Sequence, residues 1–286
     1  MSTPLRIHHL DCGTMCPHGL VPLGLAPPDP GHLVAHCLLV EAPAGLVLVD
    51  TGYGTGDVAD PRRLGPARHL LGARLDPRQT AVARVRALGL DPADVRHVLV
   101  THLDLDHAGG LGDFPNATVH LHAPELVAAR ARRRDARLRY RPAQWAHGPR
   151  WAPHATPDGD RWRGFERVSL VADVGVQIAL VPLPGHSAGH AGYAIDTGAG
   201  WLLHAGDAFL HPDEIATPPV RSRSLRAYHR LNSADHGLLL ENAARLGELA
   251  RDHADDVDVL CSHDAVALRR HQALRDGPSR ALANGA

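Results

Sequence analysis

Short apolar runs bounded by glycine, proline and aspartate dominate the first half of the chain, and such runs predict β-strands. They place strands at residues 6–10, 36–41, 46–50 and 97–101. Pro43 and Gly45 mark a turn between the second and third of these strands. The period then changes, because Val82, Val85 and Leu88 recur at helical spacing. We therefore expect a helix over residues 78–88, between the third and fourth strands.

The remainder of the chain continues the alternation of strands and helices. Its predicted strands lie at residues 117–122, 176–183, 193–196, 201–204 and 257–261. Its predicted helices lie at residues 124–134, 236–252 and 265–276. Neither a repeat nor a linker divides the chain, and interleaved strands and helices indicate an α/β fold. We therefore expect one α/β domain over residues 1–286.

One segment departs from both periodicities. Residues 139–163 are rich in Arg, Trp, Pro and His and show neither helical nor strand spacing. Irregular segments of this length usually serve as lids or binding elements. We therefore expect a lid or insert at about 124–165, in which Trp145 is a candidate substrate contact. The arginine-rich stretch 130–141 is either a solvated helix face or a contact for an anionic substrate group.

Composition narrows the classes of partner. The formal net charge is −1 and 44% of the residues are hydrophobic, so we expect neither a nucleic-acid-binding nor a membrane-surface protein. The N-terminus has no apolar signal region, and no apolar stretch is long enough to cross a bilayer. The four cysteines lack the spacing of a zinc ribbon. We therefore expect a cytoplasmic protein with reduced cysteines.

Histidine is far more frequent in this chain than in an average protein. The chain has 22 histidines, and imidazole is the commonest metal ligand in proteins. Several histidines and aspartates directly follow predicted strands, whose ends can converge at one edge of a sheet. These candidate metal ligands are His102, Asp104, Asp106, His107, His186, Asp207 and His263. Four imidazoles and three carboxylates provide enough donors for two divalent metal ions with positions left open for water.

The order of these residues along the chain follows a recognisable pattern. The segment H-L-D-L-D-H at 102–107 precedes Gly109-Gly110, then P-G-H-S-A-G-H at 184–190, Gly-Asp at 206–207 and Ser-His-Asp at 262–264. This series resembles that of metallo-β-lactamase-fold hydrolases, in their lactonase-like and glyoxalase-like branches, from residue 33 to the C-terminal region. The resemblance implies a four-layer αββα sandwich with the metal ions at one edge.

The resemblance also implies a role for each matching residue. Two metal sites would share Asp207 as a bridge, one formed by His102, Asp104 and His186 and the other by Asp106, His107 and His263. Asp50, in Leu-Val-Asp-Thr-Gly, matches a buried aspartate that supports the metal loop. We expect His190 to support the site or to pack beside it, and Ser187 to be a loop hydroxyl, because it lacks the G-x-S-x-G context of a nucleophile.

Asp104 is a departure from the family, which carries a histidine at this position. Three carboxylates and a bridging hydroxide would bring the centre's formal charge near zero instead of +1. Harder oxygen donors shift the preference from zinc, the family's usual ion, toward iron or manganese. Flavodiiron proteins, which carry glutamate here, reduce oxygen or nitric oxide with a flavin donor domain, and we expect no such domain in residues 1–286. A mononuclear site and a non-hydrolytic iron redox or sensor protein remain as alternatives.

A second departure concerns the substrate. Acyl-homoserine lactonases of this superfamily carry a tyrosine three residues after the bridging aspartate, where this chain has Leu210. Tyr53, Tyr228 and His211 are the candidates that could contact the substrate in its place. Quorum-signal lactone hydrolysis therefore does not carry over directly.

The function predicted from these residues is hydrolysis by a metal-bound hydroxide, whose pKa two cations lower toward ~7. The hydroxide attacks a lactone or other carboxylic ester carbonyl, and Asp106 or a metal-bound water returns a proton to the departing alkoxide. Thioester and phosphodiester hydrolysis are the alternative reactions. We expect a small-molecule substrate as the partner, and the pattern leaves open whether the protein forms a homodimer.

Overall fold

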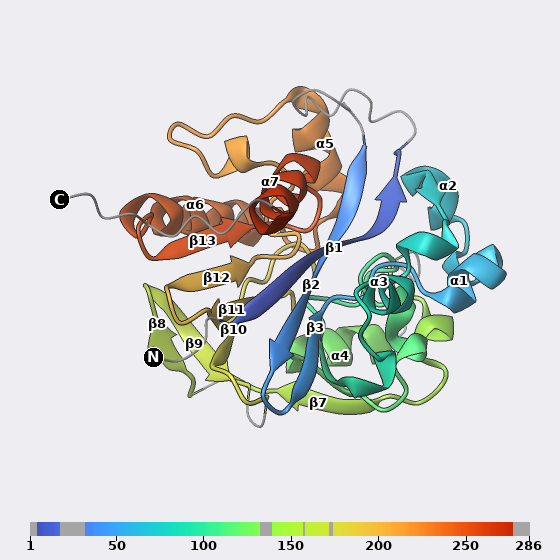
Figure 1. Ribbon diagram of the computed structural model, residues 1–286. Coiled ribbons are helices and arrows are strands. Elements are labelled where there is room, and N and C mark those ends of the chain that lie inside the picture. The colour runs from blue at the N-terminus through green and yellow to red at the C-terminus, as the bar shows by residue number, and fades with distance from the viewer. Residues whose placement is uncertain (1–4, 18–31, 132–138, 157, 172–173, 277–286) are drawn as a thin grey trace.

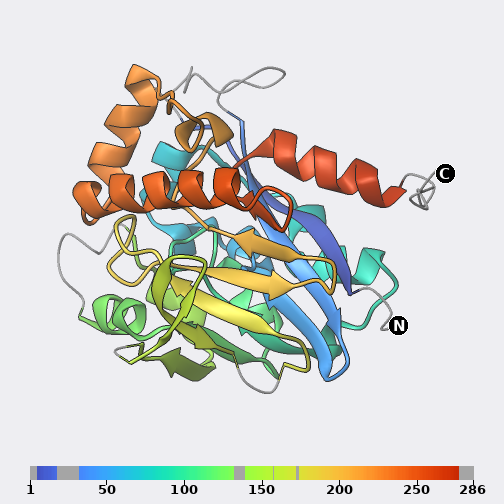
Figure 2. The same cartoon turned by 90° about the vertical axis from the view of Figure 1, so that its left-hand side faces the viewer.

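Two β-sheets lie face to face, with helices on the outer side of each, so the chain forms an αββα sandwich (Figures 1 and 2). The computed structural model describes residues 5–17, 32–131, 139–156, 158–171 and 174–276. The α/β class and the four-layer arrangement predicted from the sequence are confirmed. Among the described helices, none is both long and apolar enough to cross a bilayer.

The first sheet has seven strands in the order β4-β1-β2-β3-β5-β6-β7. Their bounds are β1 (Arg6–Met15), β2 (Leu33–Ala42), β3 (Gly45–Val49), β4 (Ala73–Arg74), β5 (Val95–Leu99), β6 (Thr118–His122) and β7 (Arg150–His154). β1, β2 and β3 pair antiparallel, whereas β3, β5, β6 and β7 run parallel. Parallel strands end at the same edge of a sheet, so the loop that follows β5 starts from this common edge.

The second sheet has six strands in the order β13-β12-β11-β10-β9-β8. Their bounds are β8 (Asp160–Trp162), β9 (Phe165–Leu170), β10 (Ile178–Pro182), β11 (Ala191–Asp196), β12 (Trp201–His204) and β13 (Val257–Leu260). β10 and β12 both pair antiparallel with β11, and β13 pairs parallel with β12. β10, β12 and β13 therefore also end at one shared edge.

The core between the sheets consists of side chains that alternate inward along the central strands. Leu38, Val49 and Leu99 of the first sheet pack with Leu180 and Tyr193 of the second, and all five are fully buried. Burial of one such side chain stabilises the fold by about 1.5–3 kcal/mol. This core fixes the two sheets against each other, and with them the loops at their edges.

Helices cover both outer faces. The α-helices are α1 (Thr55–Ala59), α2 (Ala67–Leu71), α3 (Ala81–Ala87), α4 (Ala123–Arg130), α5 (Arg223–Asn232), α6 (His236–Asp252) and α7 (Ala265–Asp276). The 3-10 helices are η1 (Pro61–Leu64), η2 (Pro77–Gln79), η3 (Pro92–Asp94), η4 (Gly109–Asp113), η6 (Pro142–Trp145) and η7 (Pro212–Glu214). Val82 and Val85 of α3 pack on the first sheet, and Leu246 and Leu249 of α6 pack on the second.

Two sequence-based expectations are wrong in their secondary structure. The segment 139–163, expected to be irregular, contains η6, β7 and β8. The sequence does not predict β7, because Pro153 interrupts its strand pattern. The fold tolerates this proline because β7 is an edge strand. Helix α5 was not predicted, because it is largely polar and buries only Leu225, Tyr228 and His229. The helix expected at 124–134 is α4 as far as Arg130, and residues 132–138 lie outside the described part.

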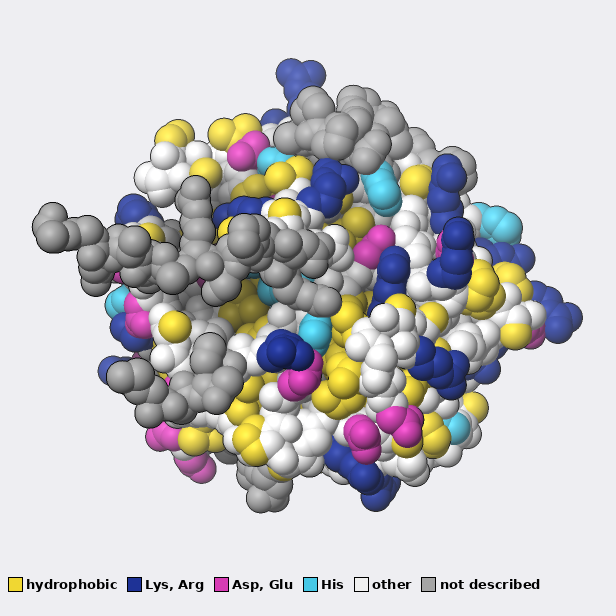
Figure 3. All heavy atoms as spheres, viewed as in Figure 1, with side chains coloured by type: hydrophobic (Ala, Val, Ile, Leu, Met, Phe, Trp, Pro, Cys, Tyr) yellow, Lys and Arg dark blue, Asp and Glu magenta, His cyan; other side chains and the backbone are white. Residues whose placement is uncertain are grey.

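Charged side chains of both signs share the molecular surface. Figure 3 shows arginine side chains in dark blue and acidic side chains in magenta interspersed over one face. This distribution agrees with the formal net charge of −1.

Candidate metal centre

The candidate metal ligands lie on four loops that leave the ends of β5, β10, β12 and β13. The loop after β5 belongs to the first sheet and the other three belong to the second. Because these strand ends meet at one side of the sandwich, the structure brings together residues as far apart in sequence as His102 and His263. This convergence is the arrangement expected from the strand-end positions.

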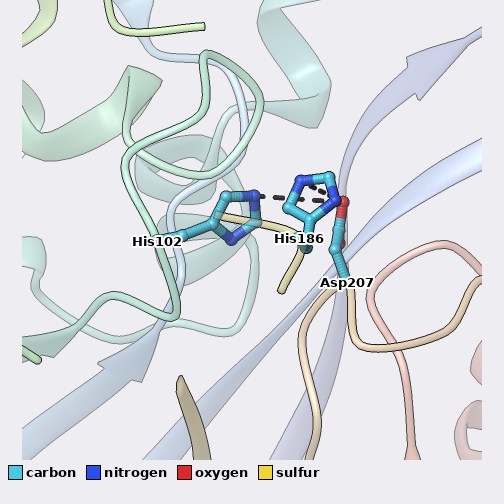
Figure 4. Close-up of side chains that lie close together, drawn as sticks. All are labelled: His102, His186 and Asp207. Carbon is cyan, nitrogen blue, oxygen red and sulfur yellow. Dashed lines mark ion pairs between the residues drawn. The ribbon is translucent and has the colours of Figure 1, made fainter. Parts of the chain in front are cut away.

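One group of donors is formed by His102, His186 and Asp207 (Figure 4). Oδ2 of Asp207 lies 3.9 Å from Nε2 of His102 and 3.5 Å from Nε2 of His186. Asp104 faces the same two rings, with Oδ2 at 3.4 Å from Nε2 of His102 and 3.1 Å from Nε2 of His186. All four side chains therefore point at one small volume.

A second group lies beside the first and consists of Asp106, His107 and His263. Oδ2 of Asp106 is 3.6 Å from Nε2 of both His107 and His263. Asp207 reaches this group too, with Oδ1 at 3.4 Å from Nε2 of His107 and Oδ2 at 3.1 Å from Nε2 of His263. Asp207 thus lies between the two groups, where one carboxylate can serve both.

Unpaired polar atoms test whether these residues fit metal ions. Nε2 of His102, Nε2 of His107, Oδ1 of Asp104 and Oδ1 of Asp207 are buried and have no hydrogen-bond partner among the described residues. An unsatisfied buried polar atom costs about 1–3 kcal/mol, so a cluster of four calls for an additional partner. Imidazole nitrogens and carboxylate oxygens are the donors that zinc, iron and manganese take. The residues present fit divalent cations.

Asp50 holds the metal loop from behind. Its Oδ1 accepts a hydrogen bond from the backbone N–H of Thr101 at 2.8 Å, and its Oδ2 accepts one from Thr101 Oγ1 at 2.8 Å. Oδ2 also lies 2.8 Å from Nδ1 of His107. This contact directs Nε2 of His107 toward Asp207. Asp50 is 1% exposed, and its backbone lies in the left-handed region at φ 55°. This strained conformation persists because its hydrogen-bond partners hold the residue in place.

His190 and His263 are oriented by contacts with the backbone. Nδ1 of His190 lies 3.0 Å from the carbonyl of Leu183, and its Nε2 accepts a hydrogen bond from the N–H of Asp207 at 2.9 Å. Nδ1 of His263 lies 2.7 Å from the carbonyl of Val34 on β2. A ligating histidine held through its other ring nitrogen presents a fixed donor. His190 is placed to position Asp207 and not to bind a cation itself.

Glu125 was not identified from the sequence, although it is fully buried beside the site. Its Oε1 accepts a hydrogen bond from the N–H of Leu103 at 2.9 Å. Its Oε2 accepts bonds from Ser187 Oγ at 2.6 Å and from the N–H of Gly189 at 3.0 Å. One carboxylate therefore joins the loop of His102 to the loop of His186. No spacing in the sequence distinguishes Glu125 from an ordinary acidic residue in the first turn of a helix.

Arg139 is a second residue that sequence reasoning did not single out within the arginine-rich stretch. Its Nη1 lies 2.7 Å from Oδ2 of Asp104, and its Nη2 donates to the carbonyl of Asn232 at the end of α5. Burial alone would raise the pKa of Asp104, but the charges of Arg139 and His102 lower it well below its ordinary value. Residues 132–138 of the same stretch lie outside the described part.

The charges around Asp207 shift the pKa values of the neighbouring histidines. Burial lowers the pKa of His107, but Asp207, Asp106 and Asp50 raise it well above 6.5. The pKa of His263 is also raised. Burial lowers it, but the charge of Asp207 has the largest raising effect. Burial and Arg139 lower the pKa of His186 to about 4. The negative charge of Asp207 and its neighbours therefore favours positive charge at this position.

A cavity of about 1600 Å³ opens over the donor groups. Its wall includes Asp104, Asp106, His186 and Asp207, so a molecule in the cavity can reach both groups. Of the four candidate substrate contacts, Tyr228 of α5 lines this cavity.

The other three candidate contacts are not among the residues that line the cavity. Tyr53 is 2% exposed and packs in a cluster with Leu105 and Leu210. Trp145 lies in η6 and packs against the core of the first sheet. His211 caps η7, because its Nδ1 accepts a hydrogen bond from the N–H of Asp213 at 3.3 Å.

The fold and the two donor groups allow a comparison with known families. The sequence profile described as the metallo-beta-lactamase superfamily matches residues 30–263, a range that includes all seven candidate ligands. The chain belongs to this superfamily. It is therefore a metal-binding hydrolase. The family predicted from the sequence motifs is confirmed.

Relatives within the superfamily include hydrolases of two kinds. A protein of Mycobacterium tuberculosis named a probable metallo-hydrolase is 43% identical over 262 residues, which cover 91% of this chain and 81% of that protein. The N-acyl homoserine lactonase AttM of Agrobacterium fabrum is 35% identical over 118 residues, 41% of this chain and 45% of that protein.

Solved structures with the same fold are more distant in sequence. An N-acyl homoserine lactone hydrolase, solved with the product N-hexanoyl-L-homoserine at its catalytic metal centre, superposes with a TM-score of 0.69 at 23% identity. The superposition covers 94% of this chain and 97% of that chain.

Proposed function

We propose that this protein hydrolyses a lactone or another carboxylic ester with two divalent cations. His102, Asp104 and His186 would hold one cation, Asp106, His107 and His263 the other, and Asp207 would bridge them. The observation that carries the proposal is the position of Asp207, whose carboxylate lies within 3.5 Å of nitrogens from both groups. When bound, such a pair of cations supplies a hydroxide nucleophile near neutral pH and polarises a carbonyl.

The residues of the chain would prepare the site for this chemistry. Asp50 holds Nδ1 of His107, and His190 accepts the backbone N–H of Asp207, which keeps the donors aligned before a substrate arrives. Asp106 lines the cavity and is the proposed acceptor and donor of the transferred proton. Tyr228 enters the same cavity from α5 and could donate a hydrogen bond to the ester. It would thereby replace the tyrosine that lactonases carry at the position of Leu210.

The mouth of the cavity supports a substrate with an apolar part. Leu70, Val127 and Leu231 line it and are 65%, 69% and 81% exposed. Large apolar side chains gathered at a cavity mouth usually mark a binding surface. The lactonase relatives act on N-acyl homoserine lactones, whose acyl chain is apolar. An ester or lactone with an acyl substituent is therefore the substrate class that we favour.

The expected insert at 124–165 contributes to the same cavity. Pro124, Val127, Tyr140 and Thr156 all lie on its wall. We propose that this segment forms the substrate side of a single domain over residues 1–286. Zinc is the ion that we propose from the family, with iron or manganese as the alternatives because Asp104 adds an oxygen donor.

The experiment that tests the proposal combines metal analysis with a substrate panel. Protein purified without chelators should contain two equivalents of metal and should open acyl-homoserine lactones faster than it cleaves thioesters or phosphodiesters. Asp207→Ala should lose turnover and metal content together. A coloured, redox-active iron protein without hydrolysis would overturn the proposal, as would full turnover by the Asp207→Ala variant.

A further inference from the structure

Asp104 stands at the one ligand position where this chain departs from its family, and Arg139 lies against it. Nη1 of Arg139 is 2.7 Å from Oδ2 of Asp104, and both side chains are 17% exposed. Oδ1 of Asp104 is buried and has no hydrogen-bond partner in the described structure. Oδ2 thus faces Arg139 and the rings of His102 and His186 together, while Oδ1 keeps free lone pairs, so the carboxylate can hold Arg139 and a cation at the same time.

The protein holds Arg139 in place from two directions. Asp104 and Tyr140 form an antiparallel backbone bridge, which fixes the residue next to Arg139 against the metal loop. Nη2 of Arg139 donates to the carbonyl of Asn232, the last residue of α5. The C-terminal end of a helix carries a partial negative charge and stabilises a cation. Arg139 is therefore anchored even without the carboxylate of Asp104.

The formal charges explain why the two residues occur together. Histidine, the family's residue at this position, is a neutral ligand, whereas Asp104 adds one negative charge to the centre. Arg139 adds one positive charge at hydrogen-bond distance. The pair of Asp104 and Arg139 is thus equivalent in formal charge to one neutral histidine.

We propose that Arg139 is the built-in counter-ion of Asp104 and that it sets the affinity of the site formed by His102, Asp104 and His186 for a divalent cation. The inference rests on the metal-binding part of the proposed function, but not on its substrate. The positive charge of Arg139 opposes a second cation nearby, so it weakens binding at this site and keeps it exchangeable. Asp104 offsets that repulsion.

Zinc titration of the metal-free protein, in competition with a chelating dye, tests this directly. Arg139→Gln should bind zinc at the site of His102, Asp104 and His186 at least about tenfold more tightly, because Arg139 no longer competes with the cation for the Asp104 carboxylate. Asp104→His should bind at least about tenfold more weakly, because Arg139 then faces the cation without a carboxylate. Asp104→His combined with Arg139→Gln should return the affinity to near that of the unchanged protein.

Two control variants distinguish the effect of the Arg139 charge on zinc affinity from the effect of substituting any arginine. Arg139→Lys keeps the charge and should stay within about threefold of the unchanged protein. Arg130→Gln removes an arginine exposed at the end of α4 and should have no effect. If Arg139→Gln does not fold, the comparison of Asp104→His with the double variant still decides the question.

The outcomes are distinct from those that test the substrate. Equal zinc affinity with and without Arg139, or a double variant that binds zinc as weakly as Asp104→His alone, would overturn the inference. So would a protein that binds no zinc at all. A protein that binds two zinc ions with the expected pattern, but hydrolyses no ester, would leave this inference standing and overturn the proposed reaction.

Discussion

Oδ2 of Asp50 lies 2.8 Å from Nδ1 of His107, while Nε2 of the same ring faces Asp106 and Asp207. The contact fixes which ring nitrogen is offered to a cation. Such partners of a ligating histidine typically contribute 10–100-fold to metal affinity, as an order of magnitude.

Asp50→Asn should therefore lower zinc affinity by about 10–100-fold, because the amide can donate to His107 and favour the wrong tautomer. Titration of the metal-free variant with zinc gives the measurement. Asp91→Asn, at an exposed residue before η3, is the matched control. Unchanged zinc affinity in Asp50→Asn would refute the positioning role of Asp50.

Glu125→Gln should destabilise the metal-free protein. The glutamine amide places a donor against the hydroxyl of Ser187 and the N–H of Gly189, which both now donate to Glu125. Mismatched buried groups of this kind cost about 1–3 kcal/mol. Urea unfolding in the presence of a chelator measures the loss, and Glu248→Gln on the exposed face of α6 should leave stability unchanged.

Tyr228→Phe should lower kcat/KM by about 10–100-fold for the best lactone or ester, if the phenol donates to the substrate. Zinc stoichiometry should not change, because Tyr228 is not a proposed ligand. Tyr53→Phe is the paired control, since the Tyr53 hydroxyl is buried without a hydrogen-bond partner among the described residues. It should keep activity, and an equal loss in both variants would show that the effect is structural.

The histidines of the first sheet predict how stability depends on pH. His120 lies 3.0 Å from both His97 and His154, and burial, followed by these two neighbours, lowers its pKa from 6.5 to about 3. The unfolded chain binds a proton below pH 6.5 that the folded chain does not. Stability contributed by neutral His120 is therefore complete above pH 6.5 and is lost as the pH falls toward 3.

Unfolding of the chelator-treated protein at pH 7 and pH 5 checks this sign. His120→Gln should lose less stability between these values than the unchanged protein, by up to about 2 kcal/mol. His69→Gln, at an exposed position on α2, accounts for the loss of one histidine. A slope that is equal in all three proteins would contradict the assignment. The raised pKa values of His107 and His263 act in the opposite direction, and they are common to all three.

Much of the site could be predicted from the sequence, because most candidate ligands lie just after the end of a strand. His102, His186, Asp207 and His263 each follow a strand closely, so locating the strands was enough to predict that they meet. Glu125 and Arg139 could not be found in this way. Their roles depend on packing between α4, α5 and the metal loops, which leaves no period in the sequence.

Two elements at the periphery of the fold, β7 and α5, could not be predicted from the sequence. β7 carries a proline and half-exposed side chains, so it lacks the alternation of an inner strand. α5 is polar on most of its surface, although it delivers Tyr228 to the cavity. In both elements the contacts with neighbours decide the structure, and they outweigh the local pattern.

The candidate ligands come from both sheets, three loops from one and one loop from the other. Two bound cations would therefore act as a removable cross-link between the halves of the sandwich. The sheets could not separate without breaking it, so the lifetime of the folded protein should be governed by how slowly the ions leave. A chelator would then shorten that lifetime even in a protein whose hydrophobic core is intact.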